Sequence, residues 1–104
     1  MYYNILVMEI VEPISEGYTV YSKSGCINCT KVKNLFKEKH IFFLEVQCDE
    51  YLLENKENFL ACIKERVKRE YKIFPIVFNN GEFIGGYNEV KQNIEKIELD
   101  FEDI

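Results

Sequence analysis

The chain has 104 residues, of which 47% are hydrophobic, 14% aromatic and 30% charged. This length and apolar content predict one globular domain and exclude a disordered or low-complexity chain. The formal net charge of -5 disfavours broad attraction to nucleic acid or to an anionic membrane. No apolar run approaches the roughly 20 residues of a membrane helix. The N-terminus has no basic segment of a secretory signal, so a cytoplasmic protein is expected.

Residues 1–16 mix β-branched and charged side chains without a clear period, and Pro13 interrupts them. They are expected to form an N-terminal extension, either a helix or an edge strand. The run 18–21 is rich in β-forming residues and is bounded by glycine-containing turns, which predicts a buried central strand. From Cys26 onward, apolar residues recur at three- and four-residue intervals, and this spacing predicts a helix that ends near residues 39–40.

The second half of the chain alternates between strand and helix signals. Residues 41–46 form a nearly continuous apolar run, which predicts a strand covered on both faces. Residues 51–72 carry apolar side chains at helical spacing and predict one long amphipathic helix. A proline-led strand and the Asn-Asn-Gly turn after it predict a hairpin over 74–84. A helix is expected from about residue 88, followed by a loose acidic tail at 100–104.

The order of elements is strand, helix, strand, helix, hairpin and helix, without an internal repeat or a long linker. This order predicts an α/β sandwich with a mixed sheet. The domain is expected to occupy residues 17–99, between the extension and the acidic tail.

The strongest chemical signal is the C-x-x-C of Cys26 and Cys29, placed where a strand turns into a helix. The N-terminus of a helix has unpaired N–H groups and a positive dipole end, which favour a thiolate over a thiol. Such settings lower a cysteine pKa from about 8.5 to between about 3.5 and 7.5. Cys29 lies one turn further along and is expected to face inward, close enough to resolve a mixed disulfide on Cys26.

Less reactive interpretations of the cysteines remain open at this point. C-x-x-C is half of many zinc sites, but Cys48 and Cys62 do not form a second such pair, and His40 is the only histidine. A structural disulfide is rare in a reducing compartment, and two cysteines can also meet in a core by coincidence. Cys48 and Cys62 are expected to be buried or half-buried packing residues.

The segment 21–33, Tyr-Ser-Lys-Ser-Gly-Cys-Ile-Asn-Cys-Thr-Lys-Val-Lys, resembles the active-site segment of the glutaredoxins. Two further glutaredoxin motifs follow in the family's order, a strand-leading proline at Pro75 and a diglycine turn at Gly85-Gly86. The match extends over about 17–97. The resemblance implies a thioredoxin-like fold, a three-layer α/β/α sandwich with a central four-stranded mixed sheet.

The resemblance also implies roles for individual residues. Cys26 would be the catalytic nucleophile and Cys29 the resolving cysteine. Pro75 would be held in cis beside them, and Phe74 would offer its backbone N–H and C=O to the cysteine of glutathione. Lys23 would stabilise the thiolate and attract the glycyl carboxylate of glutathione.

The resemblance implies further residues that would contact glutathione. Lys72 occupies the place of a family Arg or Gln that meets the glycyl carboxylate. Gly86 would allow close approach of the ligand, and the helix that follows offers an anion site for the γ-glutamyl carboxylate. Asn88, expected to be the N-cap of that helix, and Glu89 align with the family's Ser/Asp-Asp pair, where Glu89 would meet the γ-glutamyl ammonium.

The implied activity is that of a dithiol glutaredoxin, a monomer that reduces protein disulfides and protein–glutathione mixed disulfides with glutathione as co-substrate. The expected partners are disulfide-containing or glutathionylated proteins, and ribonucleotide reductase is a family client that no residue here identifies. One alternative is a reductase served by thioredoxin reductase. Another is an iron–sulfur carrier in which two chains share a [2Fe–2S] cluster through Cys26 and glutathione; no other metal is expected.

Overall fold

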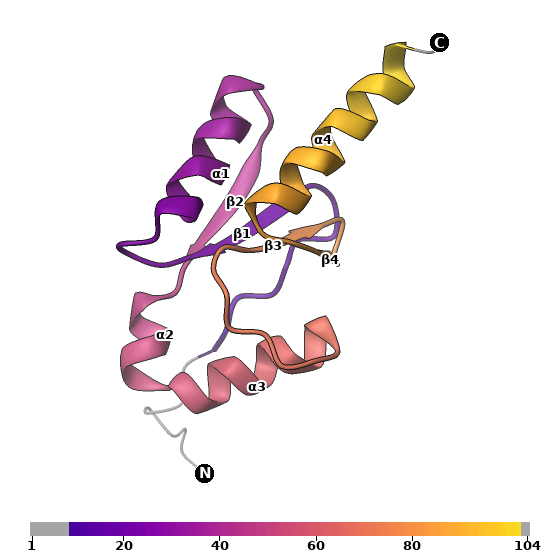
Figure 1. Ribbon diagram of the computed structural model, residues 1–104. Coiled ribbons are helices and arrows are strands. Elements are labelled where there is room, and N and C mark those ends of the chain that lie inside the picture. The colour runs from indigo at the N-terminus through magenta and orange to yellow at the C-terminus, as the bar shows by residue number, and fades with distance from the viewer. Residues whose placement is uncertain (1–8, 103–104) are drawn as a thin grey trace.

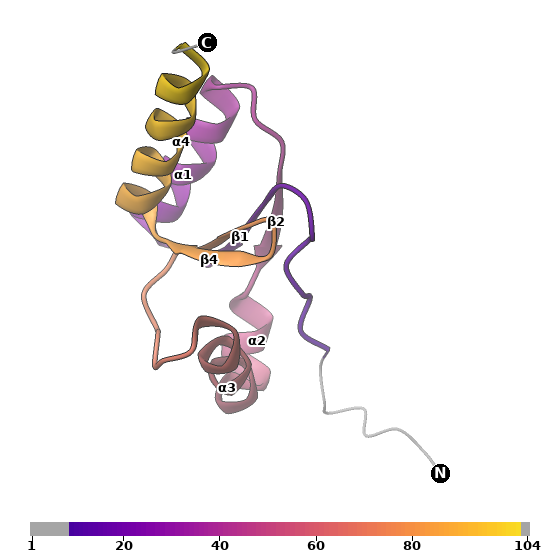
Figure 2. The same ribbon diagram turned by 90° about the vertical axis from the view of Figure 1, so that its right-hand side faces the viewer.

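The computed structural model describes residues 9–102 and has three layers, with a sheet between two pairs of helices. Helices α1 (Ile27–Glu38) and α4 (Tyr87–Glu102) cover one face of the sheet (Figure 1). Helices α2 (Asp49–Glu54) and α3 (Lys56–Val67) lie on the opposite face, as Figure 2 shows. The predicted three-layer α/β/α architecture is confirmed. Within the described residues, no helix is both long enough and apolar enough to cross a membrane.

The sheet contains four strands in the order β2-β1-β3-β4. Their bounds are β1 Tyr18–Ser22, β2 Phe43–Gln47, β3 Ile76–Asn79 and β4 Glu82–Gly85. β1 pairs in parallel with β2 and antiparallel with β3, and β3 pairs antiparallel with β4. The sheet is therefore mixed, as predicted, and its central strand β1 leads directly to the cysteine pair.

Side chains alternate between the two faces of β1 and build two separate cores. Tyr21 belongs to the core beneath α2 and α3, where its ring packs edge-on against Phe78 with centroids 5.6 Å apart. Tyr18 belongs to the core beneath α1 and α4, where its ring centroid lies 4.6 Å from that of Phe36. Because both faces of β1 are buried, its C-terminal end gives a fixed base for the loop that follows.

The single helix predicted over 51–72 is wrong, because the chain forms two helices there. α2 ends before Asn55, whose φ of -154° and ψ of 48° are not helical, and α3 begins at the next residue. The break allows Tyr51 and Phe59 to stack, with ring centroids 5.4 Å apart and an interplanar angle of 17°. α3 then ends at Val67, well before residue 72.

The strand predicted over 41–46 begins later, at Phe43, and lies at an edge of the sheet. Phe43 packs against the core beneath α1 and α4, and Leu44 packs against the core beneath α2 and α3, so both faces of the strand are covered, as expected. The cover is incomplete, because both side chains are only half-buried and Phe42, just before the strand, is 74% exposed. Only Val46 is buried within β2. The apolar run reflects packing beside the sheet edge and does not indicate a central position.

The described part of the N-terminal extension, residues 9–16, forms neither a helix nor a strand. It is held along the core by hydrogen bonds: Tyr21 donates to the carbonyl of Val11 at 2.6 Å, and the N–H of Val11 donates to the hydroxyl of Tyr51 at 3.0 Å. Residues 1–8 of the predicted extension lie outside the described residues. At the other end, α4 continues through Glu102, so the tail predicted from residue 100 is helical that far.

Candidate active site at the start of α1

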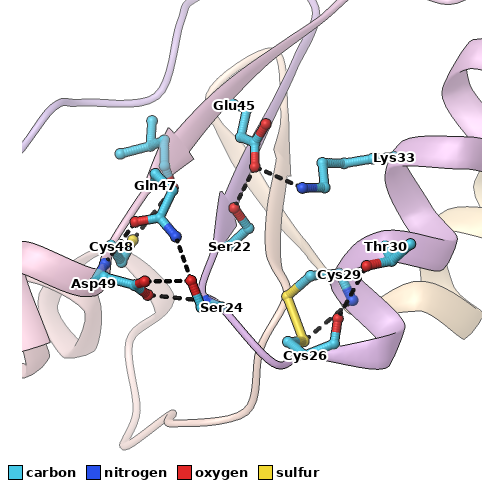
Figure 3. A network of polar contacts seen from close by, with 11 residues as sticks. Ser22, Ser24, Cys26, Cys29, Thr30, Lys33, Glu45, Gln47, Cys48 and Asp49 are labelled. Atoms are coloured by element: carbon cyan, nitrogen blue, oxygen red, sulfur yellow. Dashed lines mark hydrogen bonds and ion pairs between the residues drawn. A yellow bond between two sulfur atoms is a disulfide. The ribbon is translucent and has the colours of Figure 1, made fainter.

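Cys26 is the N-cap of α1, with extended backbone angles of φ -103° and ψ 106°. Its sulfur accepts a hydrogen bond from the N–H of Cys29 at 3.1 Å, and the two cysteines form a disulfide with Cα atoms 5.2 Å apart (Figure 3). Cys29 is 1% exposed and shares the inner face of α1 with Val32, whereas Cys26 is half-buried. The pair is therefore asymmetric, and solvent reaches mainly its first member.

No acidic side chain in the first turn of α1 opposes the effect of the helix dipole on Cys26. The N–H of Thr30 donates to the carbonyl of Cys26 at 3.2 Å, which closes the first turn of α1. The free N–H groups and the positive dipole end at this point stabilise negative charge on the Cys26 sulfur. The local geometry can thus support a reactive thiolate once the disulfide is reduced.

The loop before Cys26 is anchored by Asp49, the first residue of α2. The N–H of Ser24 donates to one carboxylate oxygen of Asp49 at 2.9 Å, and the Ser24 hydroxyl bonds to the other (Figure 3). These hydrogen bonds lower the pKa of Asp49 below its usual range. Gly25 completes the turn with a φ of +73°, a conformation that costs glycine little.

A second carboxylate joins β1, β2 and α1 next to the same loop. Glu45 accepts hydrogen bonds at the same oxygen from Lys33 at 2.8 Å and from the hydroxyl of Ser22 at 2.7 Å (Figure 3). The hydrogen bond from Lys33 is the main cause that lowers the pKa of Glu45. Sequence reasoning missed both carboxylates and both serines, because their partners lie 12 to 25 residues away in the chain.

The predicted proline site lies beside this loop. The Phe74–Pro75 peptide bond is cis, as the family resemblance implies. Phe74 is buried and stacks on Phe59, with ring centroids 6.2 Å apart, and the ammonium nitrogen of Lys23 lies 5.3 Å from the centre of the Phe74 ring. Three predicted residues, Lys23, Phe74 and Pro75, are thus brought together. Lys72 has an exposed side chain in the segment between α3 and β3.

The diglycine turn joins β4 to α4, and its details differ from the prediction. α4 begins at Tyr87, so Asn88 is its second residue and not its N-cap. Glu89 takes part in capping instead, because its carboxylate accepts a hydrogen bond from the N–H of Gly86 at 2.8 Å. The spacing of a glutamate three residues after the cap is the sequence signal for this arrangement. Gly85 adopts a φ of +138°.

Cys48 and Cys62 are buried and half-buried respectively, as predicted, and both are free thiols. The Cys48 thiol donates to the carbonyl of Val46 at 3.4 Å, and burial raises its pKa to about 12. Cys48 therefore stays protonated at neutral pH and is a poor nucleophile. Within residues 9–102 there is no group of three or more His, Cys, Asp or Glu side chains arranged to hold a metal ion.

The fold and the site together define a class of protein. A mixed four-stranded sheet lies between two helix pairs, with a C-x-x-C at the start of α1 and a cis-proline before β3. This is the architecture of a thioredoxin-like protein. Within that class, the glutaredoxin family model matches residues 18–84, and the chain belongs to the glutaredoxin family.

Curated relatives agree with this assignment. The chain is 35% identical over 81 residues to mitochondrial glutaredoxin-2 of Bos taurus, and the match covers 77% of this chain and 49% of that protein. The identity is also 35% over 81 residues with the chloroplastic monothiol glutaredoxin-S12 of Arabidopsis thaliana, covering 78% of this chain and 44% of that protein. The chain therefore spans about half the length of the curated relatives it matches.

Solved glutaredoxin structures have the same fold. Glutaredoxin 1 from Francisella tularensis, complexed with cacodylate, superposes with a TM-score of 0.66 at 30% identity, covering 77% of this chain and 93% of that one. The buckwheat glutaredoxin–glutathione complex superposes with a TM-score of 0.65 at 26% identity, covering 82% of this chain and 74% of that one.

Proposed function

We propose that the protein is a glutathione-dependent thiol–disulfide oxidoreductase that reduces protein disulfides and mixed disulfides between proteins and glutathione. The asymmetry of the cysteine pair is the observation that carries this proposal: Cys26 is accessible at the helix N-terminus, and Cys29 is 1% exposed directly behind it. This arrangement supports one cysteine that attacks substrates and one that reacts only with the first.

The proposed reaction on a glutathionylated protein uses Cys26 alone. Its thiolate attacks the glutathione sulfur of the mixed disulfide, a new S–S bond forms on Cys26, and the client protein leaves as a thiolate that takes up a proton from water. A glutathione thiolate then attacks the sulfur of the glutathione bound to Cys26. Glutathione disulfide leaves, and the Cys26 thiolate is regenerated.

Reduction of a protein disulfide uses both cysteines. Cys26 attacks one sulfur, which releases the other client thiolate and links the client covalently to Cys26. Cys29 then loses its proton to the client thiolate already released, attacks the Cys26 sulfur and releases the second client thiolate, which leaves the Cys26–Cys29 disulfide. Two glutathione molecules reduce this disulfide and are themselves oxidised to glutathione disulfide.

Glutathione would bind along the loop before β3 and the start of α4. Phe74 offers a backbone N–H and C=O beside Pro75, and Lys23 lies next to it as a cation for the glycyl carboxylate. Lys72 is an exposed second cation in the same segment. Gly86 and the N-terminus of α4 would take the γ-glutamyl carboxylate. A buckwheat glutaredoxin of the same fold was solved as a complex with glutathione, which supports glutathione as the ligand.

Two cysteine variants test the proposal. In an assay coupled to glutathione reductase, with the mixed disulfide of glutathione and 2-mercaptoethanol as substrate, Cys26→Ser should abolish turnover. Cys29→Ser should retain much of it, because this reaction does not need the second thiol. Equal loss in both variants would contradict the proposed division of roles.

The same preparation separates the alternatives. Turnover with thioredoxin reductase and none with glutathione would instead indicate a glutaredoxin-like reductase whose electron donor is thioredoxin reductase. A brown dimer after anaerobic purification would favour the cluster carrier, whereas a colourless monomer with glutathione turnover supports the present proposal.

A further inference from the structure

The loop that delivers Cys26 is held by a closed set of hydrogen bonds outside the cysteine site. Ser24 donates to Asp49 from its N–H and from its hydroxyl, and the same hydroxyl accepts a hydrogen bond from the side-chain amide of Gln47 at 3.4 Å (Figure 3). The carbonyl oxygen of that amide accepts from the N–H of Asp49 at 2.9 Å. Ser24, Gln47 and Asp49 therefore fix one another at the end of β2.

The frame behind this set is also fixed. The N–H of Cys48 donates to the carbonyl of Ser22 at 2.8 Å, which continues the pairing of β1 and β2 up to the start of the loop. Asp49 follows directly as the first residue of α2. Its carboxylate has a lowered pKa because Ser24 donates to it, so it is ionised at neutral pH and keeps its bonds to Ser24.

Ser24 lies between two residues of the site. On one side is Lys23, whose ammonium nitrogen is 5.3 Å from the centre of the Phe74 ring. On the other side is Gly25, which alone separates Ser24 from Cys26 and has a φ of +73°. Glycine reaches many other backbone conformations at low cost, so it cannot hold Cys26 in place. The anchor at Ser24 supplies the restraint that Gly25 lacks.

We propose that Asp49 is a positioning residue, which acts through Ser24 to hold the Cys26 sulfur over the N–H of Cys29 at the start of α1. Without this anchor, the loop would move among several conformations, and the sulfur would spend less time within hydrogen-bond distance of that N–H. The thiolate would lose part of its stabilisation. The inference needs Cys26 only as the reacting thiol, so it rests on that part of the proposed function and not on glutathione.

The experiment measures the pH midpoint for alkylation of Cys26 by iodoacetamide in the reduced 104-residue chain, followed on the Cys26 peptide by mass spectrometry. Ser24→Ala removes the hydroxyl without changing the charge. It should raise the midpoint by about 0.5 to 1 pH unit, which is about a 3- to 10-fold slower alkylation below the midpoint. Ser24→Thr keeps a hydroxyl and should restore most of the original value.

A double-mutant cycle separates positioning from simple charge effects. In an Asp49→Asn background, Ser24→Ala should change the midpoint little, because the anchor is already lost. In a Glu50→Gln background, which removes the neighbouring acidic charge from the first turn of α2, Ser24→Ala should keep its full effect. An unchanged midpoint in Ser24→Ala alone, or equal shifts in the wild-type and Asp49→Asn backgrounds, would overturn the inference.

Alkylation uses no glutathione, so the outcome is independent of the electron donor. A protein without glutathione turnover but with the expected midpoints would retain the positioning role and lose the proposed function. Circular dichroism of each variant verifies the fold; Ser24 lies in an exposed loop, so its variants remove no core contact.

Discussion

The ammonium nitrogen of Lys23 lies 5.3 Å from the centre of the Phe74 ring, so the loop before Cys26 touches the loop before β3. This contact joins two segments that are 51 residues apart in the chain. Lys23 is exposed, so its ammonium group can attract an anionic ligand while it lies beside the ring.

Replacement of Lys23 should therefore weaken substrate binding. Lys23→Met keeps the apolar stem and removes the charge, and we expect the KM for a glutathione mixed disulfide to rise about 1.4- to 5-fold, because an exposed ion pair contributes roughly 0.2 to 1 kcal/mol. Steady-state kinetics at low ionic strength measure this effect. Lys96→Met, an exposed lysine of α4, is the matched control and should leave KM unchanged.

The turn before α4 has room for a side chain at only one of its two glycines. An added Cβ at Gly85 would lie 2.7 Å from Cγ of Glu89, and the φ of +138° is unfavourable for any other residue. We expect Gly85→Ala to lower the free energy of unfolding by about 1 to 3 kcal/mol in urea denaturation. At Gly86 the nearest atoms would be 3.6 Å away, so Gly86→Ala should cost clearly less.

The Glu45 carboxylate predicts a pH dependence of stability. Its pKa in the folded protein lies below the ordinary value of 4.5, mainly because of the hydrogen bond from Lys33. A group with a lowered folded pKa stabilises the protein above its unfolded pKa, and this contribution is lost as the pH falls through the folded value. Glu45→Gln should therefore reduce the urea midpoint more at pH 7 than near pH 3. A constant difference at both pH values would contradict this assignment.

The hydroxyl of Tyr51 accepts a hydrogen bond from the N–H of Val11 at 3.0 Å, although the two residues lie far apart in sequence. Tyr51→Phe removes the acceptor and leaves the ring in place against Phe59. Hydrogen exchange at the Val11 N–H should become faster in this variant. The N–H of Ile14, which donates to Thr19 at 2.9 Å, is the internal control and should keep its rate.

Local patterns in the sequence predicted the sheet, the helix after Cys26 and the position of the cysteine pair, because each depends on neighbouring residues. The break at Asn55 could not be predicted in this way. The apolar spacing continues across it, and only the packing of Tyr51 on Phe59 distinguishes two helices from one. The edge position of β2 was missed for a similar reason, since an apolar run does not identify the partner strand.

The site residues also differ in whether local sequence patterns could locate them. Motif spacing located Cys26 and Cys29, but the anchoring of Ser24 by Asp49 depends on a contact across 25 residues. Asn88, the expected N-cap, is instead the second residue of α4, and Glu89 reaches back to the N–H of Gly86. Side-chain contacts of this kind decide loop geometry and leave no periodic trace in the sequence.

The burial of Cys48 gives the protein an internal reporter of its own opening. Its thiol lies at the junction of β2 and α2, is 0% exposed and has a pKa raised to about 12, so a thiol-labelling reagent reacts with it only when that junction separates. The labelling rate of Cys48 in native buffer therefore measures how often the corner behind the Cys26 loop opens. Mass spectrometry of the labelled Cys48 peptide would measure this rate without any engineered probe.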